Sequence, residues 1–287
     1  MMRMIGEVVC PSTVLLGEVV MEPQKVAPYF GTVEKPECHM LYNVTTMATI
    51  WHTLAVQDTA LLKKQLDTVC QLPKEYTFLN YLRCHDDIGW GLDFDFLRER
   101  GMDEVAHKRF LNDYYTGKFP GSWSRGELYN DDPVTQDARF CGTTASMCGV
   151  ESAGFEQDQE KMDHAVRMDL MLHAYMLTQS GIPMIYSGDE IGQVNDYSYK
   201  EDPDKCQDSR YIHRGAFRWD LARKRTDKKS VEGRIFHGLD RLEKIRRREK
   251  VFDPEADVWT YDTHVKEIMC VIRENGGERM AGIFNFS

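Results

Sequence analysis

A short apolar segment that ends in a histidine and two carboxylates places the strongest constraint on the fold. Residues 77–82 (TFLNYL) follow Pro73 and have the aromatic-rich composition of a buried strand. His85, Asp86 and Asp87 come where this strand ends. Because ligands bind at the carboxyl ends of parallel strands in α/β folds, this position favours a chemical role. From these residues alone, a solvated turn that caps a helix is the alternative.

Strand-like and helical segments alternate in the first part of the chain. The apolar run that contains Glu18 near its carboxyl end predicts a second strand. The predicted strands cover residues 13–20, 38–42 and 77–82, and the predicted helices cover 23–30 and 46–69, with a break near Asp58. This alternation indicates a parallel sheet with helical crossovers, and therefore the α/β class.

The pattern changes after residue 87, and it divides the chain into four sections. An aromatic and glycine-rich stretch is too long for an ordinary loop and predicts an inserted subdomain near the site. A strong helix over 163–180 then precedes an apolar strand over 182–186. The tail alternates with a period of two around Gly276 and Gly277, which favours antiparallel strands. The sections are 1–87, 88–155, 156–250 and 251–287.

Charge and cysteine usage exclude several classes of protein. A formal net charge of −10 disfavours nucleic-acid and anionic-membrane partners, since no basic face offsets the acidic excess. The 8 cysteines contain no CxxC pair and no partner histidine at metal-ligand spacing, so we expect reduced thiols, a cytoplasmic location, and neither a metal nor another cofactor. No signal peptide or transmembrane span is visible in the sequence.

Three motifs in the expected order resemble the α-amylase family of glycoside hydrolases. Residues 181–190 (GIPMIYSGDE) are similar to its eighth-strand motif, His85-Asp86 to its seventh-strand motif, and Gly17-Glu18 to its fifth-strand glutamate. Four further segments resemble the amylosucrase branch, whose members transfer glucosyl units from sucrose to an α-glucan or hydrolyse sucrose. These segments are residues 84–90 (CHDDIGW), 110–112 (FLN), 121–126 (GSWSRG) and 208–214 (DSRYIHR).

The resemblance implies a fold and a truncation. Family members are (β/α)8 TIM barrels, so this chain is expected to supply strands 5–8, a subdomain inserted after strand 7 and the start of a C-terminal antiparallel β domain. The family's nucleophile is an aspartate of an RxD motif on strand 4. Only 17 residues precede Glu18, and the sole carboxylate among them is Glu7. We therefore expect a C-terminal fragment that lacks the first half of the barrel and the nucleophile.

The resemblance also assigns roles to two carboxylates and their neighbours. Glu18 is the expected general acid/base, because the flanking apolar residues would keep its carboxyl protonated. Asp86 is the expected stabiliser of the oxocarbenium-like transition state, and His85 is expected to donate a hydrogen bond to the same sugar. Asp87 is expected to contact the leaving fructosyl ring or the acceptor.

Two arginines complete the expected substrate-binding set. Arg210 matches a position that closes the glucosyl pocket through a salt bridge to an upstream aspartate, and Arg139 matches a position on the acceptor side. A surface ion pair is the alternative for each. Asp189 and Glu190 are expected to be structural, since the family uses this loop to shape the pocket.

The expected function is retaining glucosyl transfer or hydrolysis on sucrose or an α-glucan, with a small sugar as the partner and no activity in the fragment alone. A non-catalytic carbohydrate-binding remnant is one alternative. A hydrolase of the α-glucosidase or α-amylase type is the other.

Overall fold

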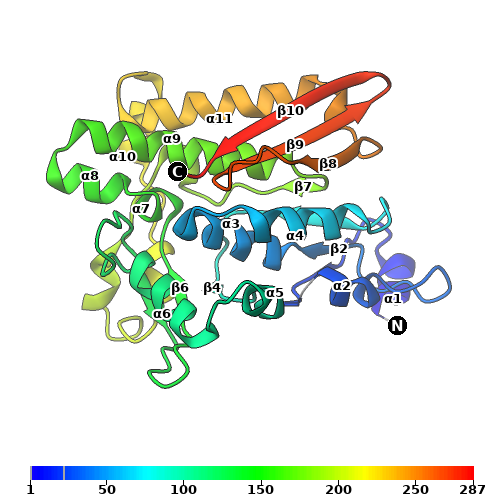
Figure 1. Cartoon of the computed structure of the whole chain (residues 1–287), viewed down its shortest axis with the longest axis horizontal. Helices are drawn as coiled ribbons and strands as arrows, with labels where there is room; N and C mark the ends of the chain where they lie inside the picture. Colours follow the sequence, from blue (N-terminus) through cyan, green and yellow to red (C-terminus); the bar gives the residue numbers. More distant parts are fainter. Residues whose placement is uncertain (1, 22) are drawn as a thin grey trace.

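The chain forms a parallel sheet of four strands, two of which, β2 (Met40–Tyr42) and β7 (Ile182–Pro183), are labelled in Figure 1. The computed structural model describes residues 2–21 and 23–287. The strands are β1 (Leu16–Gly17), β2 (Met40–Tyr42), β3 (Thr77–Asn80) and β7 (Ile182–Pro183), in the order β1-β2-β3-β7. Leu16 pairs with Met40, and Leu79 pairs with Ile182, all in parallel ladders. The predicted parallel sheet is confirmed, and its strands lie side by side in the order in which they occur in the chain.

The outer strands are shorter than predicted. Residues 13–20 and 182–186 each contribute only 2 residues to the ladder. Within the described residues, β1 pairs only with β2 and β7 only with β3, so each has hydrogen-bond partners on one side alone. A strand paired on one side gains fewer ladder bonds and can leave the sheet early.

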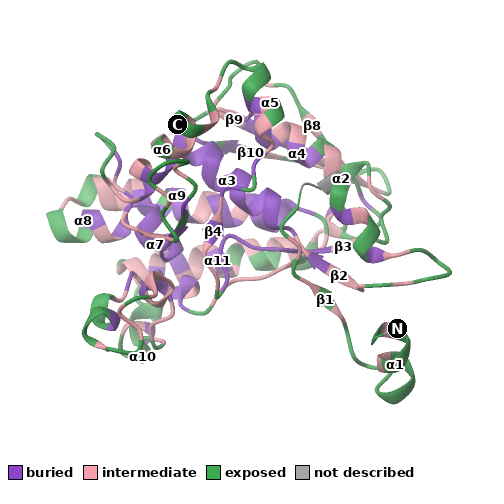
Figure 2. Ribbon diagram, turned by 90° about the horizontal axis from the view of Figure 1, so that it is seen from below, coloured by how far each residue is buried: buried purple, intermediate pink, exposed green. Residues whose placement is uncertain are grey.

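Helical crossovers link the first three strands of the sheet. A short helical pair, α2 (Pro23–Val26) and η1 (Ala27–Phe30), joins β1 to β2. Helices α3 (Val44–Val56) and α4 (Ala60–Cys70) join β2 to β3. The predicted break near Asp58 is confirmed: Gln57 takes a left-handed conformation, and the Asp58 side chain accepts a hydrogen bond from the Ala60 amide. Helix α3 is buried along almost its whole length and forms the middle of the core (Figure 2).

The 88–155 region contains an antiparallel sheet of its own, in the order β4-β6-β5. Its aromatic side chains stack closely, with the Tyr115 and Phe140 rings 4.5 Å apart and the Trp90 and Phe140 rings 4.7 Å apart. The Trp51 indole of α3 meets Tyr115 edge to face, so this region shares the main core. Its elements are β4 (Ile88–Gly89), α5 (Phe94–Glu99), α6 (Glu104–Tyr115), β5 (Glu127–Tyr129), β6 (Arg139–Cys141), α7 (Thr144–Met147) and α8 (Val150–Glu156).

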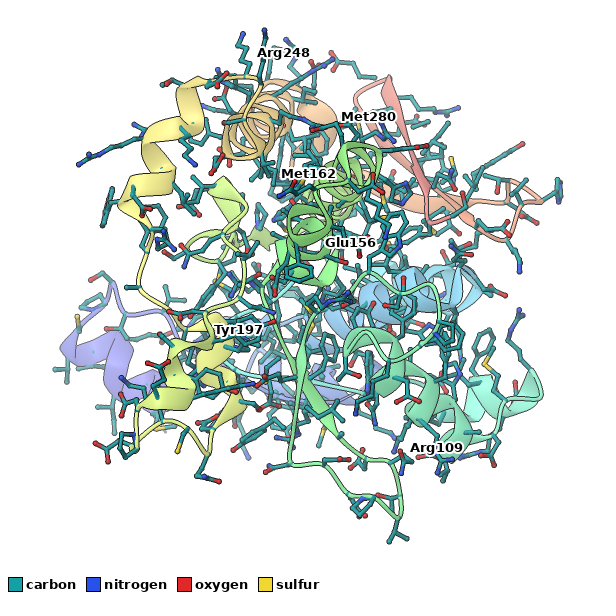
Figure 3. The ribbon with its side chains drawn as sticks, turned by 90° about the vertical axis from the view of Figure 1, so that its left-hand side faces the viewer. Arg109, Glu156, Met162, Tyr197, Arg248 and Met280 are labelled. Atoms are coloured by element: carbon teal, nitrogen blue, oxygen red, sulfur yellow. The ribbon has the colours of Figure 1, made fainter. Side chains whose placement is uncertain are left out.

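Two long helices, one before β7 in the chain and one after it, pack against each other. Helix α9 (Gln159–Thr178) begins at the side-chain cap of Asp158 and packs on α11 (Val231–Arg248), with Met162 in their shared cluster (Figure 3). Short helical turns fill the loop between β7 and α11. These are η2 (Asp189–Ile191), η3 (Tyr197–Glu201), η4 (Ser209–His213), α10 (Trp219–Ala222) and η5 (Arg223–Thr226).

The tail forms the predicted antiparallel sheet after η6 (Lys250–Phe252). Its strands are β8 (Asp257–Tyr261), β9 (Ile268–Asn275) and β10 (Glu278–Asn285). The turn between the last two uses Gly276 and Gly277, both with positive φ. The sheet packs on α4 and α9 through β8 and β10.

Helix α1 (Met2–Val9) stands apart from the body and has no buried residue (Figure 2). Its apolar side chains Met2, Ile5, Val8 and Val9 are all more than half exposed. No helix in the described residues is long and apolar enough to cross a membrane.

Candidate active site

Glu18 and Asp86 lie at the same end of the parallel sheet, because each follows the carboxyl end of its strand. One side-chain atom each of Glu18, His85 and Asp86 lies within 4.8 Å of the others. The two carboxylates line a hollow of about 270 Å³ together with Asp87 and Arg139. The motifs predict that these residues share one site, and the structure brings them together.

The surroundings of Glu18 differ from the expectation. Glu18 is exposed, and the side chains of Val14, Leu16 and Val20 are also exposed rather than packed around it. The reason is that Glu18 follows an outer strand whose far side has no neighbour in the described residues. The apolar packing expected around Glu18 is therefore not found in the described residues, and the acid/base role expected of Glu18 rests on the resemblance and on its position.

Asp86 is held by arginines. Its Oδ1 accepts a hydrogen bond of 2.9 Å from Arg210 Nη1 and lies 3.7 Å from Arg214 Nη2. Partial burial acts to raise the pKa of Asp86, but the hydrogen bonds from Arg210 and from the Asp87 backbone outweigh it, and the pKa lies below its usual value. Asp86 is thus a carboxylate near neutral pH, as a stabiliser of positive charge must be.

Asp87 is the more buried of the two neighbouring carboxyls, with a side chain only 5% exposed. Burial raises its pKa first, and the negative charge of Asp86 raises it further. Its nearest cationic atom in the described structure is Arg139 Nη1, at 3.4 Å. Asp87 Oδ1 is buried without a hydrogen-bond partner in the described residues, although Asp87 lines the hollow. A buried oxygen that lacks a donor is a suitable acceptor for a sugar hydroxyl.

Arg210 does not have the partner that the resemblance implied. Instead of an upstream aspartate, it pairs with Asp86 and, through Nε and Nη2, with both oxygens of Asp208. Its guanidinium also lies 4.5 Å from the centre of the Tyr129 ring. Arg139 is 55% exposed, so its pair with Asp87 is close to the surface-pair alternative.

His85 contributes its backbone to the site as well as its exposed side chain. The His85 carbonyl accepts a 2.5 Å hydrogen bond from Arg214 Nε, and the buried His213 imidazole lies 3.4 Å away. Burial and the positive charge of Arg83 lower the pKa of His213 to about 3, so this ring is neutral near pH 7. His213 and Arg214 were not among the predicted site residues, although both lie in the 208–214 segment that carried the resemblance.

Glu18, His85 and Asp86 could in principle surround a cation, and within the described part of the chain they are the one such group. Asp86 Oδ1 already forms an ion pair with Arg210 Nη1, at 2.9 Å. A bound cation would therefore compete with a guanidinium, and we assign no metal here.

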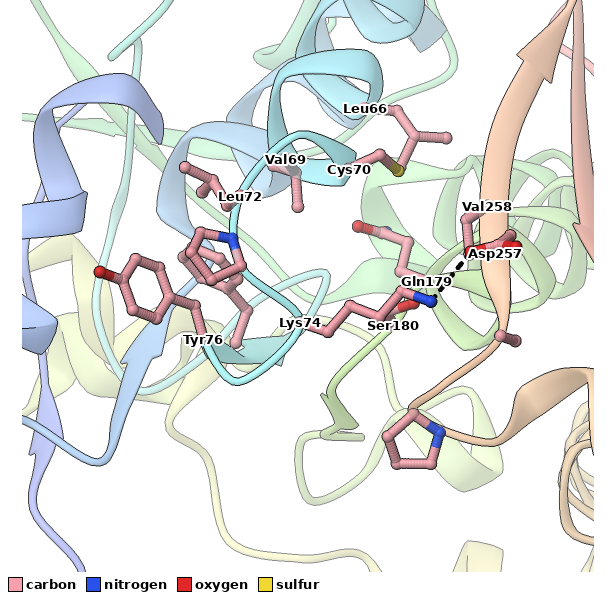
Figure 4. Close-up of a pocket in the computed structure, with 14 residues that line it drawn as sticks. Leu66, Val69, Cys70, Leu72, Lys74, Tyr76, Gln179, Ser180, Asp257 and Val258 are labelled. Atoms are coloured by element: carbon pink, nitrogen blue, oxygen red, sulfur yellow. Dashed lines mark hydrogen bonds and ion pairs between the residues drawn. The ribbon is translucent and has the colours of Figure 1, made fainter. Parts of the chain in front are cut away.

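A second hollow, of about 140 Å³, lies at the opposite end of the sheet (Figure 4). Phe78 of β3 and Gln179 and Ser180 before β7 form part of its wall, and Lys74 pairs with Asp257 across it. Because it borders the amino-terminal ends of the strands, it is separate from the Glu18 and Asp86 site.

The fold of this chain matches about half of the fold of several solved enzymes, among them an α-amylase. Sucrose 6F-phosphate phosphorylase from Thermoanaerobacter thermosaccharolyticum superimposes with a TM-score of 0.68 and 18% sequence identity, over 98% of this chain and 49% of that chain. The α-amylase from H. orenii superimposes with a TM-score of 0.53 and 15% identity, over 99% of this chain and 45% of that chain. No family model matches the sequence.

The curated relatives include phosphorylases, as the structural neighbours do. Glucosylglycerate phosphorylase of Escherichia coli (strain K12) is 24% identical over 100% of this chain and 48% of its own length. The glucosylglycerate phosphorylase of Spirochaeta thermophila is 23% identical, over 88% of this chain and 40% of its own length. The chain thus spans about half the length of the curated relatives it matches. The four proteins named here are phosphorylases and an α-amylase, and none of them is an amylosucrase.

Proposed function

We propose that this chain carries the acid/base and the transition-state stabiliser of a retaining glucosyl-transferring enzyme that acts on a small α-glucoside. The observation that carries the proposal is the approach of Glu18 and Asp86 within 4.8 Å at the carboxyl end of a parallel sheet. At this spacing both carboxyl groups can reach one sugar ring. Catalytic groups of TIM-barrel enzymes lie at this end of the strands.

The proposed roles follow from the charge that each step creates. Glu18 donates its proton to the glycosidic oxygen as the bond from that oxygen to the anomeric carbon breaks. Asp86 stabilises the positive charge that develops on the ring. In the second half of the reaction, Glu18 takes the proton of the acceptor hydroxyl as the new bond forms. His85 and Asp87 are proposed to bind sugar hydroxyls, with Arg139 on the acceptor side and Arg210 beside the glucosyl ring.

The acceptor has three candidates. The motifs shared with amylosucrase favour an α-glucan acceptor with sucrose as donor, or water in a hydrolase. The names of the two phosphorylase relatives favour inorganic phosphate. The guanidinium groups of Arg139 and Arg214 near the hollow offer charge that would attract such an anion.

The nucleophile of a retaining mechanism is not among the residues assigned here, so we propose that the 287-residue chain alone does not turn over. The test joins it to the amino-terminal half of the Escherichia coli relative and offers sucrose, glucosylglycerate and starch as donors, each with phosphate, α-glucan or water. Fructose, glucose and glucose 1-phosphate are measured together. Turnover by the joined protein and not by the chain supports the proposal. Turnover by the chain itself, or cleavage of starch alone, contradicts it.

A sugar-binding protein without catalysis is the second candidate. It is favoured by Arg210, which occupies an oxygen of Asp86 in the free structure. Calorimetric binding of sucrose by the chain, together with an inactive joined protein, would favour this candidate over the first.

A further inference from the structure

A buried ion pair lies behind the candidate site. Arg83 Nε donates a 2.9 Å hydrogen bond to Asp189 Oδ1, and Nη2 lies 2.8 Å from the same oxygen. Both side chains are only 2% exposed. The Tyr186 ring covers the guanidinium, with its centre 4.4 Å away. Such a pair is costly to break, because the partner that remains is an uncompensated buried charge.

The pair connects parts of the chain that are distant in sequence. Arg83 lies between β3 and His85, and Asp189 lies in η2 after β7. The second oxygen of Asp189 accepts a hydrogen bond from the Thr144 hydroxyl of α7, at 3.0 Å. Arg83 Nη1 donates to the His213 carbonyl at 3.4 Å. The pair therefore touches the 88–155 region and the end of η4 as well as the sheet.

The residues at the end of η4 contact the candidate site. The His213 ring accepts a hydrogen bond from the Gly142 amide and lies next to the His85 carbonyl. The same carbonyl accepts a hydrogen bond from Arg214 Nε. Arg210, at the other end of the same turn, holds Asp86. A shift of the His213 carbonyl away from Arg83 would thus move both arginines relative to Asp86.

We propose that the Arg83–Asp189 ion pair is a positioning element that fixes the 208–214 segment against His85 and Asp86. It thereby keeps the Arg210 guanidinium in hydrogen-bond contact with Asp86. Neither Arg83 nor Asp189 is assigned contact with substrate. The inference rests on the proposed function only for the use made of Asp86, because the contacts themselves exist in the free chain.

The test measures the pKa of the Asp86 carboxyl by carbon NMR in the 287-residue chain, with no need for turnover. Arg83→Met and Asp189→Asn are compared with the parent. If the pair acts by position, both changes loosen Arg210 and raise the pKa of Asp86, by about one pH unit, the lower end of the effect of an adjacent arginine. If the pair acts only through its charges, Asp189→Asn removes a negative charge and must lower this pKa.

Two further sets of variants distinguish a positioning effect on Arg210 from a general loss of stability. In an Arg210→Ala background, Arg83→Met and Asp189→Asn should raise the pKa of Asp86 less than in the parent, because only the longer contact of Arg214 remains for them to act through. Arg246→Met is the matched control: this partly buried arginine caps the carbonyls of Leu177, Gln179 and Gly181, so its loss should lower stability and leave Asp86 unchanged. If Arg83→Met does not fold, Arg83→Lys and Thr144→Val provide milder changes of the same contacts.

A fall or no change in the pKa of Asp86 in folded Asp189→Asn, or an equal rise in Arg246→Met, would overturn the proposal. Failure of the joined protein to transfer glucosyl groups would overturn the proposed function and leave this result standing.

Discussion

An oxygen of Glu18 and an oxygen of Asp86 lie within 4.8 Å of each other, although the two residues follow different strands. Strand β2 lies between β1 and β3, so the sheet must curve to bring the ends of its first and third strands this close. The relationship depends on the parallel pairing of β1, and anything that displaces β1 displaces Glu18.

Gly181 is predicted to be essential for the opposite edge of the sheet. Its φ is +107°, and a Cβ would lie 2.3 Å from the Phe78 carbonyl oxygen. Gly181→Ala should lower the free energy of unfolding by about 2 kcal/mol or more, since backbone strain and a backbone clash combine. Urea denaturation is the measurement. Gly101→Ala is the control, because Gly101 also has positive φ but no atom lies within 4 Å of its Cβ position; equal losses would contradict the prediction.

Two buried histidines are predicted to make the fold sensitive to acid. Burial lowers the pKa of His52 and that of His213 to about 3, so both stay neutral when folded but bind protons near pH 6.5 when unfolded. The unfolded state therefore gains protons first as the pH falls, and each histidine should cost about 2 kcal/mol of stability between pH 7 and pH 5.

The check compares unfolding at the two pH values for the parent and His52→Gln. The variant should lose about 2 kcal/mol less than the parent over this range. His264→Gln, at an exposed position, should behave like the parent. An unchanged pH dependence in His52→Gln would show that His52 titrates normally in the folded chain.

Helix α1 is predicted to drive self-association. Its Ile5 and Val8 side chains are 56% and 82% exposed, and Val14 and Val20, which flank β1, are also exposed. Exposed apolar side chains of this kind favour contacts between copies. Light scattering after size exclusion should show dimers or larger species for the parent and a shift toward monomer for Ile5→Lys/Val8→Lys. Val134→Lys, at an isolated exposed position, should have no effect. A monomeric parent would contradict this prediction.

The sequence predicted the parts of this structure that local patterns determine. Period and composition predicted the parallel strands through 77–82 and the antiparallel tail, and the apolar run before His85 predicted that Asp86 follows a strand end. The short outer strands were beyond such patterns, because ladder length depends on neighbours that the local sequence does not name.

The same limit applies to the candidate site. The exposure of Glu18 follows from its place on an outer strand, and the pairing of Arg210 with Asp86 and Asp208 follows from how the 208–214 segment folds back. The contact of Arg83 with Asp189 joins residues that no periodicity relates. Only the tertiary structure brings these groups together.

The most direct test of the proposed roles uses two donors that differ in their need for an acid. Sucrose has a poor leaving group that must be protonated, whereas the fluoride of α-glucosyl fluoride departs without a proton. In the joined protein, Glu18→Gln should lower kcat/KM for sucrose, or for glucosylglycerate if that is the donor used, by about 10²–10⁴ and change the value for the fluoride little. Asp86→Asn should lower both by about 10² or more. Glu7→Gln, on exposed α1, should lower neither. Equal losses on both donors for Glu18→Gln, or full activity of Asp86→Asn, would contradict the assignment.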